Sequence, residues 1–325
     1  MKRREVLAIL GSSLTLATLP AWGQKKRIPR VAWFSYGDAR SVEGMLAAFT
    51  RGMQQQGYVA GKNVTIDVLM GEFSQEKTYQ LAAELVANPP DLIVTQGFAV
   101  RAVMQRTRTI PVVSGFSGDM VEGKLVASHA RPGGNVTGIQ FLAPELVGKR
   151  MEMLKELLPK LNRVAVIADP GHAGELLERA ASQAAADKLQ IRMDYYPVRS
   201  LPEIDAALES ARAGGAQALV VFPDSVTLTG KERIAAYAIK HRLPSVSGWD
   251  VFAEAGLLLM YGPNLNACWS RLAYHVDRIL KGAKPAELPV EMPTTVEVIV
   301  NLKTAKALGI AVPQSFLLRA DRVIE

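Results

Sequence analysis

Small, acidic and aromatic residues gather in this sequence at the points where short apolar runs end. Aromatic side chains are flat and bury much apolar area at low entropic cost, so they can enclose a ring-bearing ligand. Carboxylates at such points can pair with a ligand ammonium group, and free amides at helix N-termini can hold a carboxylate. The pattern therefore favours noncovalent binding of a small zwitterion, such as an α-amino acid.

The candidate ligand contacts are the polar and aromatic residues within these run ends. They are Tyr36, Thr95, Gln96, Phe98, Phe116, Ser117, Asp119, Asp169, Asp224, Trp249 and Tyr261. The same residue types also have structural tasks, because Asp and Ser cap helices and aromatic side chains fill cores. The sequence alone leaves both interpretations open at each position.

Motifs for catalysis or cofactor binding are missing from the chain. It contains no G-x-G-x-x-G, no Walker A sequence, no H-E-x-x-H and no G-x-S-x-G around Ser114 or Ser117. The four histidines are scattered, and Cys268 is the only cysteine, so neither a zinc cluster nor an intramolecular disulfide is expected. We expect no cofactor and no enzymatic activity. An exported enzyme that uses Asp169 and Asp224 as an acid/base pair is a weaker alternative.

The apolar runs alternate with segments of helical spacing, which is typical of parallel βαβ units. The first series has predicted strands at 30–36, 63–70, 91–97, 110–116 and 135–141, with helices at 42–58, 77–88 and 99–107. The second has strands at 163–169, 191–198, 217–224, 244–250 and 257–261, with helices at 144–159, 174–189, 202–213 and 230–241. Residues 30–32 resemble 163–165, and 110–116 resemble 243–249 at the same offset, as expected for duplicated lobes.

The last sixty residues do not start a third lobe. A helix is predicted at 263–281, followed by an extended segment marked by Pro285, Pro289 and Pro293, a strand at 296–300 and a helix at 302–308. The predicted fold is α/β, with two doubly wound parallel-sheet lobes joined by a multi-strand hinge. The N-terminal lobe takes residues 28–141 and 263–286, the C-terminal lobe takes 142–262 and 287–325, and the ligand cleft lies between them.

The N-terminus has the layout of a cleavable signal peptide over residues 1–23. Lys2, Arg3 and Arg4 precede an apolar run at 6–19, which is too short to span a bilayer, and a small-x-small site ends at Gly23. The arginine pair approximates a twin-arginine signal, and the Sec route stays open. Because no lipobox cysteine lies beside the cleavage site, we expect a soluble mature protein in the periplasm.

The charge pattern excludes one class of partner. The chain carries 38 Lys and Arg against 31 Asp and Glu, a formal net charge of +7. The basic residues are spread along the chain and form no stripe with interleaved aromatics, so we expect no nucleic-acid partner.

Several stretches carry a family resemblance. They include Asp119-Met120-Val121, 130–138 (ARPGGNVTG), 241–244 (HRLP), Tyr261-Gly262-Pro263-Asn264-Leu265 and 301–309 (NLKTAKALG). On these residues, the chain from 30 to 325 resembles the tryptophan-binding-like substrate-binding proteins of ABC transporters, with the type I periplasmic-binding-protein fold. Met120 stands where the family usually has proline, and 95–98 (TQGF) replaces a run of smaller residues.

The resemblance implies a receptor that captures a small solute and delivers it to a membrane permease with its ATPase. A receptor that docks through both lobes is expected to work as a monomer. A ligand sensor for a membrane signalling partner is the main alternative.

Overall fold

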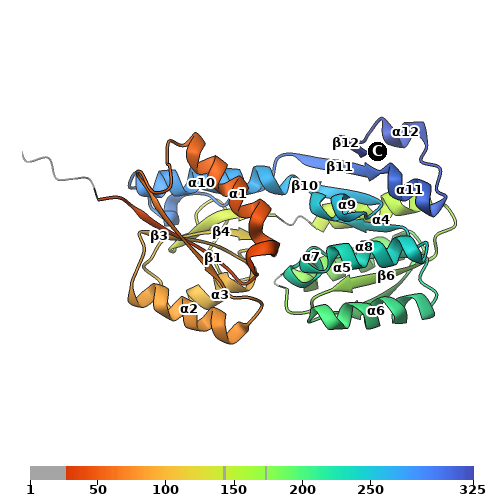
Figure 1. The fold of residues 1–325 in the computed structure, drawn as a ribbon, viewed down its shortest axis with the longest axis horizontal. Helices are drawn as coiled ribbons and strands as arrows, with labels where there is room; N and C mark the ends of the chain where they lie inside the picture. The colour runs from red at the N-terminus through yellow and green to blue at the C-terminus, as the bar shows by residue number, and fades with distance from the viewer. Residues whose placement is uncertain (1–26, 142–143, 173) are drawn as a thin grey trace, which may run out of the picture.

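The computed structural model describes residues 27–141, 144–172 and 174–325, which form two α/β units side by side (Figure 1). The predicted signal peptide lies outside the described residues. Among the described helices, none combines the length and the apolar character that crossing a membrane requires.

The first unit is built on a five-stranded parallel sheet with strand order β2-β1-β3-β4-β5. Its strands are β1 (Arg30–Ser35), β2 (Thr65–Met70), β3 (Leu92–Gln96), β4 (Val112–Phe116) and β5 (Val136–Gln140). Its helices are α1 (Ala39–Gln55), α2 (Gln75–Ala87), α3 (Gly97–Met104) and, from far along the chain, α10 (Leu265–Leu280).

The second unit is built on a seven-stranded sheet with strand order β12-β11-β10-β9-β8-β6-β7. Its strands are β6 (Arg163–Ala168), β7 (Arg192–Pro197), β8 (Ala218–Val221), β9 (Ser245–Ser247), β10 (Leu259–Pro263), β11 (Val296–Asn301) and β12 (Arg322–Ile324). Its helices are α4 (Pro144–Leu157), α5 (Glu175–Lys188), α6 (Leu201–Ala213), α7 (Ser225–Thr229), α8 (Lys231–Lys240), α9 (Asp250–Ala255), α11 (Leu302–Leu308) and α12 (Gln314–Leu317). All its strand pairs are parallel except β10 with β11.

The predicted fold class, α/β with two parallel sheets, is confirmed. The central strands β1 and β6 are buried along nearly their whole length, because helices cover both faces of each sheet. The chain passes from the first unit to the second after β5, returns to the first unit after β10, and passes to the second unit again before β11. The third of these passages contains the short 3-10 helix η1 (Pro285–Glu287), in a segment that was predicted to be extended. The residue boundaries of the two lobes stay a prediction.

The late helix α10 completes the core of the first unit. It packs along α1, and the rings of Trp33 and Trp269 lie 5.7 Å apart between the sheet and the helix. The approach of the two helices is close, since a Cβ atom at Gly52 would lie 2.3 Å from the carbonyl oxygen of Ser270. Figure 1 shows α10 beside α1 at the top of the first unit.

Three short helices of the second unit, α7, α9 and α12, were not predicted, and the first two lie where a predicted strand was expected to end. The predicted strand 217–224 ends at Val221, and Asp224 caps α7 by accepting a hydrogen bond from the Thr227 amide at 2.7 Å. The predicted strand 244–250 ends at Ser247, and Asp250 is the first residue of α9. Acidic residues after a strand favour a helix start because their oxygens satisfy free amides.

We predict that Gly138→Ala lowers the free energy of unfolding by roughly 2–5 kcal/mol. Gly138 has φ of +142° in β5, and a Cβ atom there would lie 2.0 Å from the Ser114 carbonyl oxygen. The matched control is Gly44→Ala on the exposed face of α1, where no atom lies within 4 Å of the added Cβ. That change should stabilise by about 0.5–1 kcal/mol, because alanine restricts the unfolded chain. Urea unfolding of both variants should show a lower free energy of unfolding for Gly138→Ala and a higher one for Gly44→Ala.

Candidate functional site

A cavity of about 380 Å³ lies between the two units, at the carboxyl ends of both sheets. From the first unit it is lined by Tyr36, Gln75, Gly97, Phe98 and Arg101. From the second unit it is lined by Asp169, Pro170, Gly171, His172, Arg199 and Ser225. Most of these residues follow the last residue of a strand within a few positions, which is where open α/β sheets bind ligands.

The wall contributed by the first unit is aromatic. The ring centroid of Tyr36 lies 5.2 Å from that of Phe98 and 5.8 Å from that of Phe73, and Tyr79 lies 5.4 Å from Phe98. The Tyr36 hydroxyl donates a hydrogen bond of 2.8 Å to the Phe73 carbonyl oxygen. That bond and the surrounding rings fix the orientation of Tyr36, so a planar apolar surface faces the cavity without an entropic cost on binding.

The wall contributed by the second unit is polar, and four of its residues come from the loop after β6. The Asp169 side chain accepts a hydrogen bond of 2.8 Å from the Gly171 amide, and the His172 amide donates to the Asp169 carbonyl oxygen. Burial raises the pKa of the Asp169 carboxyl above its usual value of 3.8. Burial, and then the positive charge of Arg101 across the cavity, lower the pKa of His172 to about 4, so this imidazole is neutral at neutral pH.

Two guanidinium groups approach the cavity from opposite sides. The Arg101 guanidinium group on α3 makes no hydrogen bond or ion pair with any residue that the structure describes. Arg199 lies 3.8 Å from Glu203 in an exposed ion pair, and its charge lowers the pKa of Asp169. Arg101 is therefore a cation available for an anionic group of a ligand, and sequence reasoning missed it because it lies one helical turn beyond the strand end.

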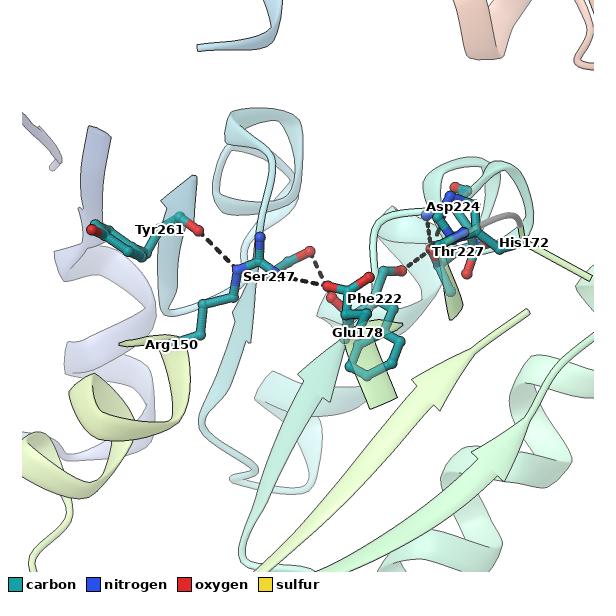
Figure 2. A network of polar contacts seen from close by, with 10 residues as sticks. Arg150, His172, Glu178, Phe222, Asp224, Thr227, Ser247 and Tyr261 are labelled. Carbon is teal, nitrogen blue, oxygen red and sulfur yellow. Dashed lines mark hydrogen bonds and ion pairs between the residues drawn. The ribbon is translucent and has the colours of Figure 1, made fainter. Parts of the chain in front are cut away.

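Asp224 is buried below the loop and serves the protein backbone. Its carboxylate accepts hydrogen bonds from the amides of Asp169, at 2.8 Å, and of Thr227, at 2.7 Å (Figure 2). Burial raises the pKa of Asp224 to about 7. Both oxygens are thus occupied by backbone amides, and the residue holds the base of the pocket loop in place.

The remaining predicted contacts lie outside the lining of this cavity. Thr95, Phe116 and Trp249 are buried, the last two within apolar clusters. Gln96 donates a hydrogen bond to the Met45 sulfur atom, and the Asp119 carboxylate accepts from the amides of Val121 and Glu122. Ser117 and Tyr261 are half-buried, and the Tyr261 carbonyl oxygen accepts a bond from Arg150. Of the predicted contacts, the cavity gathers Tyr36, Phe98 and Asp169.

Residues that sequence reasoning did not select complete the lining. Gln75, Arg101 and Ser225 begin or occupy helices just beyond strand ends, whereas His172 and Arg199 lie in the loops that follow β6 and β7. Within the described parts of the chain, no group of three or more His, Cys, Asp or Glu side chains is arranged to hold a metal ion.

Comparison with known proteins agrees with this architecture. The profile of the ABC transporter substrate-binding proteins matches residues 35–324. The chain is 24% identical over 270 residues to the tyrosine-binding protein of Clostridioides difficile, covering 82% of this chain and 77% of that protein.

Two solved structures share the fold closely. A conserved domain protein of Vibrio cholerae is 25% identical with a TM-score of 0.85, covering 91% of this chain and 100% of that one. An ABC domain of Streptococcus pneumoniae in complex with L-Trp is 24% identical with a TM-score of 0.84, covering 91% and 99%. The resemblance found in the sequence, and the expectation of a solute-binding receptor rather than an enzyme, are confirmed by the family match. The chain belongs to the ABC transporter substrate-binding protein family.

Proposed function

We propose that this protein captures an aromatic amino acid, or a similar ring-bearing zwitterion, and delivers it to an ABC permease with its ATPase. The observation that carries the proposal is the composition of one cavity, which joins an aromatic wall to an unpaired arginine and a carboxylate. The ring stacks in the Tyr36–Phe98 corner, Arg101 binds the ligand carboxylate, and Asp169 accepts the ammonium group. The relatives named above for tyrosine and tryptophan support the same ligand class.

Closure of the two units follows from this division of contacts. The ligand ring and carboxylate touch the first unit, whereas the ammonium group touches the second, so all contacts form together only when the units approach. The lobe boundaries expected from the sequence, 28–141 with 263–286 and 142–262 with 287–325, are consistent with the two sheets. They form part of the proposal, with a permease reading the closed shape.

The place of action is a further part of the proposal. The family match supports an extracytoplasmic receptor, and the basic and apolar N-terminus of the sequence supports export by the Sec or twin-arginine route to a periplasm. We propose that the mature receptor works as a monomer.

The direct test is ligand binding by the purified protein without residues 1–23. After unfolding and refolding to remove carried-over ligand, isothermal titration with L-tryptophan, L-tyrosine and L-phenylalanine should give a Kd on the order of micromolar for at least one of them. Glycine is a control that lacks the aromatic ring, and D-glucose is a control that lacks the zwitterionic groups. Absence of binding to every aromatic amino acid would contradict the ligand assignment.

We predict that Arg101→Met weakens binding of the amino acid at least about tenfold. A charge-assisted hydrogen bond is worth about 1.5–3 kcal/mol, and the variant removes the unpaired cation that receives the ligand carboxylate. Arg106→Met, on an exposed position outside the cavity, is the control because it removes the same charge. Equal affinities for the two variants would exclude Arg101 as the carboxylate partner.

The pH dependence of binding tests the role of Asp169. The carboxylate must be ionised to accept the ammonium group, and its pKa is raised above 3.8, so protonation begins at a higher pH than for an ordinary aspartate. Affinity should therefore be full at pH 8 and should fall as the pH is lowered, starting at a higher pH than an ordinary aspartate would cause, while the ligand stays a zwitterion. Asp169→Asn should bind weakly at pH 8 and lose this dependence; titrations at several pH values distinguish the two patterns.

A further inference from the structure

An arginine is buried in the second unit, away from the cavity, and cross-links three elements. Arg150 on α4 and Glu178 on α5 form an ion pair at 2.5 Å, with only 2% and 1% of their side chains exposed. The Arg150 Nε donates a hydrogen bond of 2.8 Å to the Tyr261 carbonyl oxygen in β10. Figure 2 shows the guanidinium group between these two partners, with Ser247 of β9 beside it.

The surrounding backbone leaves space for this guanidinium group. A Cβ atom at Gly248 would lie 2.1 Å from Arg150 Nη2, so only glycine fits there while Arg150 keeps its position. A Cβ atom at Gly262 would lie 2.0 Å from the Gly248 carbonyl oxygen, so the chain after β9 and the end of β10 are also in close contact. The arginine thus lies at a crowded point where its geometry is tightly defined.

Helix α5 depends on this pair because its inner face is polar. The buried residues of α5 are Glu175, Glu178, Ser182 and Ala186, a set without a large apolar side chain. Apolar packing fixes a helix only loosely along its axis, whereas an ion pair with hydrogen-bond geometry is directional. The Arg150–Glu178 pair therefore sets the position of the first turns of α5 relative to α4 and β10.

The first turn of α5 carries the pocket loop. The Glu178 amide donates to the Gly174 carbonyl oxygen, and the Gly174 amide lies 3.3 Å from His172 Nδ1. These two hydrogen bonds connect Glu178, through Gly174, to the loop that presents Asp169 and His172 to the cavity.

The helix that carries Arg150 and its partner Tyr261 both lie next to passages of the chain between the units. Helix α4 is the first element after the passage from β5, and Tyr261 lies two residues before the end of β10. Just beyond β10, the Asn264 side chain donates a hydrogen bond of 2.8 Å to Glu297 in β11, which joins the second and third passages.

We infer that the Arg150–Glu178 pair positions the pocket loop relative to the passages between the units, and thereby fixes the ligand-binding wall of the second unit. Arg150 and Glu178 are positioning residues, since neither lines the cavity. The effect on ligand affinity rests on the proposed function, but the effect on the loop does not.

The test replaces both charges at once, by Arg150→Met with Glu178→Leu. Exchange of a buried ion pair for apolar residues of similar volume is often neutral for stability, so this double variant is expected to fold with a similar thermal midpoint. The loop is then read without any ligand, by NMR titration of the His172 imidazole, assigned with His172→Gln. In the wild type, this signal should not titrate between pH 5 and 8, because the pKa of His172 is about 4.

In the double variant, the loop moves from its half-buried position across the cavity from Arg101, and the His172 titration should enter the range between pH 5 and 7. The affinity for the aromatic amino acid should fall about tenfold, as for the loss of one hydrogen bond. The matched control is Arg163→Met with Asp194→Leu, which removes a pair of 2.6 Å at the opposite end of β6. That control should leave both readouts unchanged.

A folded double variant with a wild-type His172 titration would overturn the inference, as would an equal change in the control variant. If the wild type binds no aromatic amino acid, the proposed ligand fails, and the His172 titration still decides the role of the pair. A single Arg150→Lys variant should resemble the double variant, because one ammonium group cannot serve the Tyr261 carbonyl and the Glu178 carboxylate with the fork geometry of arginine.

Discussion

A parallel sheet that is covered by helices on both faces can meet a small molecule only at its strand ends, and this constraint governs the whole site. β1 and β6 are buried on both faces, so their side chains serve the core. The chemistry is left to the residues that follow them, Tyr36 after β1 and Asp169 after β6. Because both sheets point their carboxyl ends at the same space, loops distant in the sequence converge on one cavity.

The acidic residues of the second unit divide their work according to burial. Asp169 is half-buried and faces the cavity, whereas Asp224 lies beneath it with both oxygens engaged by amides. Glu178 is equally buried and is paired with Arg150. The three carboxyl groups therefore differ in role: Asp169 is the proposed ligand contact, Asp224 supports the loop, and Glu178 anchors the helix behind the loop. Backbone amides satisfy both oxygens of Asp224, and Arg150 pairs with one oxygen of Glu178.

The sequence was sufficient for the fold class and for most strands and long helices, because β-branched runs and helical spacing alternate clearly. It selected Tyr36, Phe98 and Asp169, which line the cavity, because these residues lie one or two positions after a strand. It did not select Arg101 on α3 or Arg199 in the loop after β7, since a charged residue looks the same in the sequence whether it faces a cavity or water. Phe116 and Trp249 show the opposite error. They are aromatic residues near strand ends that were selected as ligand contacts but lie inside apolar clusters. The partner of Glu178 was equally hidden, because nothing in the spacing of α4 and α5 reveals which buried side chains meet.

The placement of α10 has a consequence for the order of events during synthesis. Trp33 near the N-terminus finds its ring partner only in Trp269, so the core of the first unit stays incomplete until more than four-fifths of the chain has left the ribosome. Domains generally fold as units during synthesis, but here the first-made sheet must wait for a late helix. The nascent first unit thus remains incompletely folded for most of the chain's production.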